Sequence, residues 1–172
     1  MSFLQRQESY PSIIYMIEIE RKFLVTSNVF KAEAFKKTRI IQGFLNRDPE
    51  RTVRVRLKKN KGVLTVKGKS SNDGLSRFEW EKEIKKDEAE SLLRLCKTGV
   101  IDKIRYEVKV GNHIFEVDEF FEDNLGLIVA EVELKHEKET FRKPEWLGKE
   151  VTGNVKYYNS QLSKAPYISW KE

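Results

Sequence analysis

The chain has 172 residues, of which 39% are hydrophobic and 35% charged, and its net charge is +6 at pH 7. This length fits one domain with a substantial core, and the charged fraction is well above the usual quarter. The single Cys96 excludes an internal disulfide framework and is typical of a reducing compartment, so we expect a cytoplasmic protein. No apolar run approaches the roughly 20 residues that span a bilayer, which argues against a membrane protein.

The first fifteen residues lack the basic and then apolar pattern of a signal peptide. Met16 directly precedes the first periodic segment of the chain. We therefore interpret residues 1–15 as a flexible N-terminal extension and residues 16–172 as a single domain.

Alternation of charged and apolar residues begins at residues 17–25, IEIERKFLV. In a strand, Glu18, Glu20 and Lys22 would lie on one face, because successive side chains point to opposite faces. The same period of two recurs in seven further segments and predicts about eight antiparallel strands joined by hairpin loops. These segments are 39–46, 51–58, 63–69, 77–84, 103–110, 114–120 and 127–135.

Helices are predicted at three places, from capping residues and glycine stops. They are residues 27–37 after a Ser27 cap, residues 87–99 from an Asp87 cap to Gly99, and residues 155–164 after a loop over 144–153.

The charged faces of the predicted strands are sorted by sign. Acidic pairs occur at Glu18/Glu20, Glu79/Glu81, Glu116/Asp118 and Glu131/Glu133, and basic pairs at Arg54/Arg56 and Lys67/Lys69. An open sheet with one solvated face is one arrangement that fits the alternation. A closed barrel with an apolar exterior and a charged lumen is the other. The sorting favours the barrel, because enclosed charge must be paired or must bind a ligand.

The chemistry of these faces indicates phosphoryl transfer. Carboxylate pairs offer oxygen ligands, which hard cations such as Mg²⁺ or Mn²⁺ prefer. Zinc is not favoured, since His113 and His136 are far apart and Cys96 falls in a predicted helix. Basic strand residues would cradle phosphate oxygens; they are Arg54, Arg56, Lys67 and Arg105. Metal ions, carboxylates and a ring of cations together are what phosphoryl transfer requires.

The segment Glu18-x-Glu20-x-Lys22 resembles the E-x-E-x-K signature of the CYTH family, also called triphosphate tunnel metalloenzymes. Further family landmarks follow in order: QGFL at 42–45, VRVR at 53–56, LTVK at 64–67, RFEWEKEI at 77–84, KIRY at 103–106, FEVD at 115–118, AEVEL at 130–134 and PEWLGKEVTGNVKYYNSQL at 144–162. The resemblance covers roughly residues 16 to 162. It implies an α+β fold, in which an eight-stranded antiparallel barrel encloses a triphosphate and carries helices on its outside.

The resemblance also implies a role for individual residues. The implied metal ligands, for two Mg²⁺ or Mn²⁺ ions, are Glu18, Glu20, Asp118, Glu131 and Glu133. The implied catalytic residues are Glu20, Lys22, Glu81 and Glu133. The implied substrate-binding residues are Lys22, Arg54, Arg56, Lys67, Arg105 and Lys156. Asn154 and Lys156 depart from the Asp and Arg of many bacterial relatives, and lysine supplies a point charge without the bidentate fork of arginine.

The short single-domain form, with EIERKFLV and AEVEL, looks most like the bacterial tripolyphosphatase branch. We therefore expect metal-dependent hydrolysis of inorganic tripolyphosphate first, and of nucleoside or thiamine triphosphates second. The alternatives are a class IV adenylyl cyclase and a non-enzymatic polyphosphate-binding module. We favour catalysis because the acidic and basic sets are both present.

The basic pI of about 9.3 would also suit a nucleic-acid partner. Acidic and basic residues are interleaved in most strands, however, and this argues against a continuous stripe that follows a phosphate backbone. The expected partner is a small molecule containing a triphosphate, bound by a monomer or homodimer.

Overall fold

The computed structural model describes residues 17–96 and 99–170. The predicted N-terminal extension lies outside the described residues. Nine strands form: β1 (Ile17–Val25), β2 (Lys36–Asn46), β3 (Arg51–Lys58), β4 (Lys61–Gly68), β5 (Ser76–Lys85), β6 (Ile101–Val110), β7 (His113–Phe120), β8 (Ile128–Glu133) and β9 (Leu147–Glu150). The helices are α1 (Phe30–Glu33), α2 (Lys86–Leu95) and α3 (Asn159–Leu162), with 3₁₀ turns η3 (Glu122–Asn124), η4 (Val155–Tyr157) and η5 (Tyr167–Ser169).

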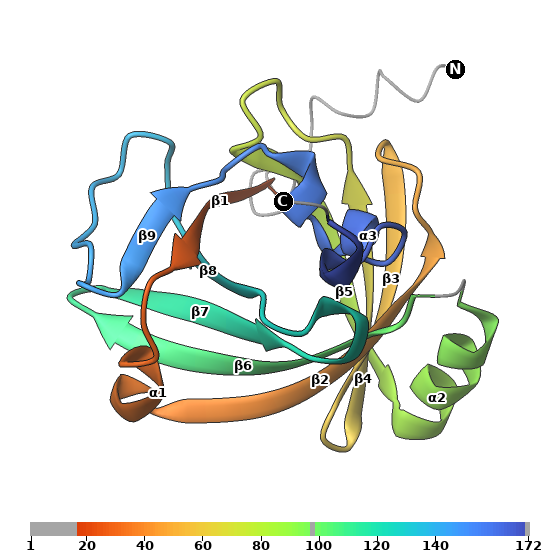
Figure 1. The fold of residues 1–172 in the computed structure, drawn as a ribbon. Coiled ribbons are helices and arrows are strands. Elements are labelled where there is room, and N and C mark those ends of the chain that lie inside the picture. Colours follow the sequence, from red (N-terminus) through yellow and green to blue (C-terminus); the bar gives the residue numbers. More distant parts are fainter. Residues whose placement is uncertain (1–16, 97–98, 171–172) are drawn as a thin grey trace, which may run out of the picture.

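The sheet closes on itself. Its antiparallel neighbours run in the order β5-β4-β3-β2-β6-β7-β8-β1, and β1 also pairs with β5. The closing contact matches Ile17 with Phe78 and Glu18 with Arg77. The result is the eight-stranded antiparallel barrel that the sequence predicted, seen as a ring of arrows in Figure 1.

Strand β1 pairs with β8 along one edge, and its other edge is divided between two strands. Its beginning pairs with β5, and its end pairs with β9, where Phe23 lies opposite Glu150. The sequence predicts a loop where β9 lies. Four residues with a single large apolar side chain, Leu147, are too short to show a period of two.

The apolar face of the strands points outward, and other elements cover it. A cluster of Phe23, Phe115 and Val132 packs with Phe30 of α1 and with Trp146. Helix α2 (green in Figure 1) packs outside β3 and β4. Gly62 allows this approach, because a Cβ there would lie 2.5 Å from the Cβ of Ala89.

One end of the barrel interior is apolar as well, which the sequence analysis did not predict. Ile101 and Phe120 continue the charged faces of β6 and β7 at two-residue steps, and Phe44 follows Gln42 on the inward face of β2. They form the apolar plug, a buried cluster of Phe44, Ile101, Phe120, Leu127, Val129 and Leu162. Leu162 belongs to α3, which lies in the barrel opening in Figure 1. The charged lumen therefore occupies only part of the barrel.

The helices differ from the prediction in extent. Only Phe30–Glu33 is helical within residues 27–37, because β2 already begins at Lys36. Helix α2 begins at Lys86, and the backbone N–H of Lys85 donates to Glu88 Oε2 at 2.8 Å. The C-terminal prediction divides into η4 and α3. Among the described residues, no helix has the length and apolar character needed to cross a membrane.

Candidate functional site

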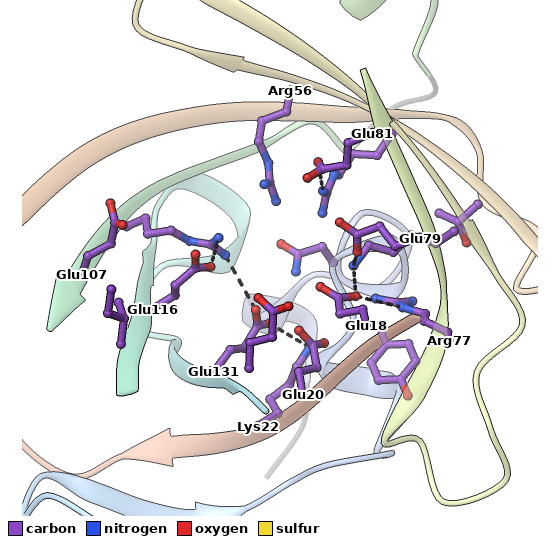
Figure 2. A pocket seen from close by; sticks show the side chains of 18 of the residues that line it. Glu18, Glu20, Lys22, Arg56, Arg77, Glu79, Glu81, Glu107, Glu116 and Glu131 are labelled. Atoms are coloured by element: carbon purple, nitrogen blue, oxygen red, sulfur yellow. Dashed lines mark hydrogen bonds and ion pairs between the residues drawn. The ribbon is translucent and has the colours of Figure 1, made fainter. Parts of the chain in front are cut away.

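A cavity of about 670 Å³ lies inside the barrel, and charged side chains from seven of its strands line it. Most of the predicted site residues share it: Glu18, Glu20, Lys22, Arg54, Arg56, Lys67, Glu81, Arg105, Glu131 and Glu133. Figure 2 shows Arg56 and Glu81 across this space from Glu20, Lys22 and Glu131. The alternation in the sequence thus brings residues from distant strands to one site.

Two neighbouring strands build the acidic wall of the cavity, defined as Glu18, Glu20, Glu131 and Glu133. Strands β1 and β8 pair so that Glu20 lies opposite Glu133 and Lys22 lies opposite Glu131. All five side chains point into the lumen, because they share the parity of the inward face. The register therefore concentrates carboxylates at one place.

Glu20 and Glu133 are the least compensated carboxylates of this wall. Glu20 Oε1 lies 4.0 Å from Lys22 Nζ, and the Glu20 side chain is only 18% exposed. Burial raises the pKa of Glu20, and the charges of Glu131 and Glu18 raise it further. The pKa of Glu133 is also raised, first by burial and then by neighbouring carboxylates. Carboxylates that repel one another in this way provide a place for a cation.

The other two carboxylates are paired with lysines. Glu131 Oε1 lies 3.0 Å from Lys22 Nζ, and Glu18 Oε2 accepts a hydrogen bond of 2.7 Å from Lys67 Nζ. Burial opposes ionisation of Glu131, but Lys22 and Arg105 hold its pKa well below the usual range. Glu79 shares the same lysine, since its Oε2 also lies 2.7 Å from Lys67 Nζ.

The donor set of the acidic wall fits a divalent cation, although no ready-made metal site is present. Within residues 17–96 and 99–170, no three His, Cys, Asp or Glu side chains are grouped so as to hold a metal ion. Lys22 and Lys67 instead neutralise Glu131 and Glu18. The available ligands are all carboxylate oxygens, which hard cations prefer, and Glu20 with Glu133 is where added positive charge relieves most repulsion.

Arginines form the basic wall on the other side, defined as Arg54, Arg56 and Arg105. All three are at least nine-tenths buried. Arg54 Nη2 donates to Thr65 Oγ1 at 3.1 Å and lies 3.6 Å from Glu81 Oε2, whereas its Nε has no hydrogen-bond partner among the described residues. An unpartnered buried donor costs free energy unless a ligand accepts from it.

Arg56 is the least compensated member of the basic wall. Its Nε donates to Gln42 Oε1 at 3.1 Å, and no carboxylate of the described chain lies within ion-pair distance of it. Burial lowers the pKa of Arg56 to about 9, and the positive charges of Arg54 and Arg105 contribute. Cations held together against their own repulsion favour a multiply charged anion between them.

A model of the CYTH domain family matches residues 16–167. This chain belongs to the CYTH family. Inorganic triphosphatases are similar to it: one from Acetivibrio thermocellus is 46% identical over 156 residues, 90% of this chain and 98% of that relative. Another, from Nitrosomonas europaea, is 33% identical over 153 residues, 86% of this chain and 97% of that relative.

Solved structures share this CYTH barrel. The crystal structure of the inorganic triphosphatase NE1496 has a TM-score of 0.59 and 29% identity, and covers 85% of this chain and 93% of that one. A putative adenylyl cyclase, HpAC1 from Hippeastrum, has a TM-score of 0.55 over 69% of this chain and 80% of that one, but its 18% identity indicates a common fold alone.

Asp118, which was predicted to be a metal ligand, does not line the cavity of this CYTH barrel. Its Oδ2 accepts hydrogen bonds from Lys103 Nζ at 2.6 Å and Arg105 Nη2 at 2.8 Å, and its Oδ1 accepts one from Arg105 Nε at 2.7 Å. Burial would raise the pKa of Asp118, but Arg105 and Lys103 lower it to about 2. Both oxygens are engaged, and Asp118 lies behind the cavity lining, so we correct its assignment to the positioning of Arg105.

Lys156 also departs from its predicted position. It does not line the cavity, and its ammonium lies 4.3 Å from the ring centroid of Trp170. This is a cation–π contact between C-terminal residues. The predicted contact of Lys156 with a terminal phosphate is therefore not supported by its position.

The C-terminal segment contributes residues that the sequence analysis missed. Tyr158 lines the cavity, and its ring centroid lies 5.1 Å from Lys22 Nζ and 5.6 Å from Arg77 Cζ. Asn159 Oδ1 accepts hydrogen bonds from Gln42 and Lys103, both at 3.1 Å. No periodicity marks residues of a short helix as part of a barrel lumen. Arg77, in contrast, shared the parity of Glu79 and could have been found.

Proposed function

We propose that this CYTH protein hydrolyses a linear triphosphate bound inside the barrel, with inorganic tripolyphosphate as the preferred substrate. The observation that carries the proposal is the uneven compensation of charge across one cavity. Arg54 and Arg56 keep positive charge and an unpartnered donor on one side, while Glu20 and Glu133 keep negative charge on the other. The inorganic triphosphatases from two bacteria, 46% and 33% identical to this chain, support the same reaction.

The buried arginines are the proposed phosphate-binding groups. Arg54, Arg56 and Arg105 would donate hydrogen bonds to the phosphate oxygens, since the paired N–H donors of arginine match the geometry of two phosphate oxygens. Arg105 is held rigidly by two carboxylates, Asp118 and Glu116. Lys67 would add a point charge from β4. These buried donors are already oriented, so little reorganisation is needed as charge develops on the leaving phosphate.

The acidic wall would hold Mg²⁺ or Mn²⁺ through Glu18, Glu20, Glu131 and Glu133. A bound divalent cation would supply Lewis-acid chemistry, by neutralising phosphate charge and acidifying water. The metal ion would then neutralise part of the charge of Glu131 and Glu18, and Lys22 and Lys67 could turn in part to the phosphates of the substrate. We further propose two metal ions, a cytoplasmic location and a monomer or homodimer.

Lys22 would act as a cation and not as a general base. Burial disfavours its charge, but Glu131 and Glu20 raise the pKa of Lys22 above its usual value. It therefore stays protonated at neutral pH, and the ring of Tyr158 limits its movement. In this position Lys22 orients Glu131 and can stabilise negative charge on a phosphate oxygen.

Phosphate release tests this proposal. Purified protein would be assayed with tripolyphosphate, ATP and thiamine triphosphate, each with Mg²⁺, Mn²⁺ or EDTA. We expect metal-dependent release that is greatest with tripolyphosphate and is lost on chelation. Full activity in EDTA would contradict the metal assignment.

The same assay separates the alternatives. Formation of cyclic AMP from ATP, with little free phosphate, would support a cyclase. Tight binding of tripolyphosphate without turnover under any metal condition would support a polyphosphate-binding module.

A further inference from the structure

A second cavity of about 500 Å³ adjoins the central one beside the β3–β4 hairpin. The two cavities share four lining residues, Lys58, Arg105, Glu107 and Glu116. Figure 2 shows Glu107 and Glu116 on the side of the central cavity away from Glu18 and Arg77. The space beside the basic wall therefore continues toward the hairpin.

Thr38 carries an unpartnered hydroxyl into this second cavity. The residue is only 9% exposed, and its Oγ1 has no hydrogen-bond partner among residues 17–96 and 99–170. A buried hydroxyl without a partner costs free energy, and such groups in native proteins usually meet water or a ligand. Thr38 can donate to an anion, since a hydroxyl carries one hydrogen.

Lys58 brings uncompensated positive charge to the boundary between the two cavities. Two other lysines of the second cavity are paired: Lys36 Nζ lies 2.7 Å from Glu107, and Lys61 Nζ lies 3.3 Å from Glu83. Lys59 also lines the cavity, but it is exposed to solvent. In the described part of the chain, no carboxylate lies within ion-pair distance of Lys58. Burial lowers the pKa of Lys58 to about 8, and the positive charges of Arg56 and Arg105 add to the shift. A second anionic group would relieve this repulsion.

We propose that the second cavity is a subsite for a fourth phosphate group of a linear inorganic polyphosphate, held by the Lys58 ammonium and the Thr38 hydroxyl. The inference rests on the proposed function, because the first three phosphates occupy the central cavity. A polyphosphate bound against Arg56 and Arg105 reaches the boundary between the two cavities, and its next phosphate group lies beside Lys58. Substrate choice then depends on chain length as well as on the triphosphate unit.

An organic group attached to a triphosphate is the competing occupant. Ile40 and Val63 line the second cavity and give it an apolar surface. A neutral group there would leave the positive charge of Lys58 without an ion-pair partner. A phosphate group would provide one, so the charge of Lys58 favours phosphate over an organic group.

The experiment compares chain lengths in matched variants. Values of kcat/KM for tetrapolyphosphate and for tripolyphosphate would be measured under one metal condition in the wild type, Lys58→Met and Thr38→Val. Lys82→Met is the control, because Lys82 is an exposed lysine whose neighbours on β5, Glu81 and Glu83, point toward the cavities. We expect each test variant to lower the tetrapolyphosphate-to-tripolyphosphate ratio about tenfold, as for loss of one charge-assisted hydrogen bond, while the control keeps the wild-type ratio.

Calorimetric titration in EDTA gives a second readout without turnover. The wild type should bind tetrapolyphosphate more tightly than tripolyphosphate, and Lys58→Met should remove this difference. Hydrolysis of tripolyphosphate with equal affinity for both chains would overturn the subsite and leave the triphosphatase proposal intact. Absence of any hydrolysis would refute the proposed function, and the calorimetric comparison would still decide the subsite. If the test variants instead change the ratio of kcat/KM for ATP to that for tripolyphosphate, and leave the tetrapolyphosphate ratio unchanged, the second cavity holds an organic group and the proposal is overturned.

Discussion

The acidic wall and the basic wall face each other across one cavity, and in each of them some charge is only weakly compensated. In the acidic wall, lysines neutralise Glu18 and Glu131, while Glu20 and Glu133 have raised pKa values. In the basic wall, Asp118 holds Arg105, while Arg56 has a lowered pKa of about 9. The paired charges fix the geometry of the site, and the unpaired charges are the ones available to ligands.

The weakly compensated charges also affect the stability of the fold. Charges without partners destabilise the ligand-free protein, because burial without compensation is costly. Removing one of them should therefore stabilise the fold and impair function at the same time. Removing a paired charge should impair both.

The largest effect is expected for Glu20→Gln. If Glu20 holds a metal ion as proposed, its loss should lower kcat/KM on the order of 10² to 10³-fold, measured with tripolyphosphate. Glu145→Gln is the matched control, since Glu145 is an exposed loop glutamate. Near-normal activity in Glu20→Gln would remove Glu20 from the catalytic set.

Thermal unfolding of the same variant tests how well Glu20 is compensated in the folded protein. The pKa of Glu20 is raised in the folded state, so the folded protein binds this proton more tightly than the unfolded chain does. Its contribution to stability is therefore present at low pH and is lost as the pH rises through the raised pKa. We expect the metal-free Glu20→Gln protein to melt at a higher temperature than wild type at neutral pH, with the difference shrinking in acid. A lower melting temperature at neutral pH would contradict the uncompensated state of Glu20.

Arg56→Gln should have the same two effects as Glu20→Gln, which are lower activity and no loss of stability. We expect kcat/KM for tripolyphosphate to fall about 10- to 100-fold, the usual cost of losing charge-assisted hydrogen bonds. The metal-free variant should be at least as stable as wild type, because repulsion from Arg54 and Arg105 is relieved. Arg39→Gln is the control, since the Arg39 side chain is 69% exposed and paired with Asp102. A destabilised Arg56→Gln would show that Arg56 is structurally compensated.

The apolar plug gives the opposite expectation. Phe120 is 1% exposed, and Phe120→Ala should cost about 3 to 5 kcal/mol of unfolding free energy, measured by urea denaturation. Phe35→Ala should cost far less, because Phe35 is 58% exposed. A small loss for Phe120→Ala would mean that the plug contributes little to closing the barrel.

Much of this barrel could be predicted because a period of two survives in single strands. Local alternation alone placed Glu18, Glu131 and Arg54 on the charged faces of their strands, and closure of the sheet brought these faces together around one cavity. The end of the lumen could not be predicted in this way. Phe120 has the same parity as Glu116 and Asp118 on β7, yet it packs with Phe44 and with Leu162 of α3 in an apolar cluster that only the docking of α3 explains.

The role of Asp118 was hidden for a related reason. Alternation places Asp118 on the inner face beside Glu116, but it does not reveal that Lys103 and Arg105 occupy both of its oxygens. Pairing across strands depends on the length of the side chains and on their depth in the barrel. The spacing of residues along one strand does not show which side chains will pair.

Lys156→Met is expected to have the smallest effect. It distinguishes the role that the family resemblance implies for Lys156 from the role that its position indicates. The family pattern predicts a phosphate contact at Lys156, whereas the structure places its ammonium over Trp170. Loss of this cation–π contact should cost about 0.5 to 1 kcal/mol of stability. KM for tripolyphosphate should stay near the wild-type value, while Lys67→Met, which removes a buried cation of the cavity, should raise it strongly. A large rise in KM for Lys156→Met would mean that the C-terminal segment moves on substrate binding and brings Lys156 to the phosphates.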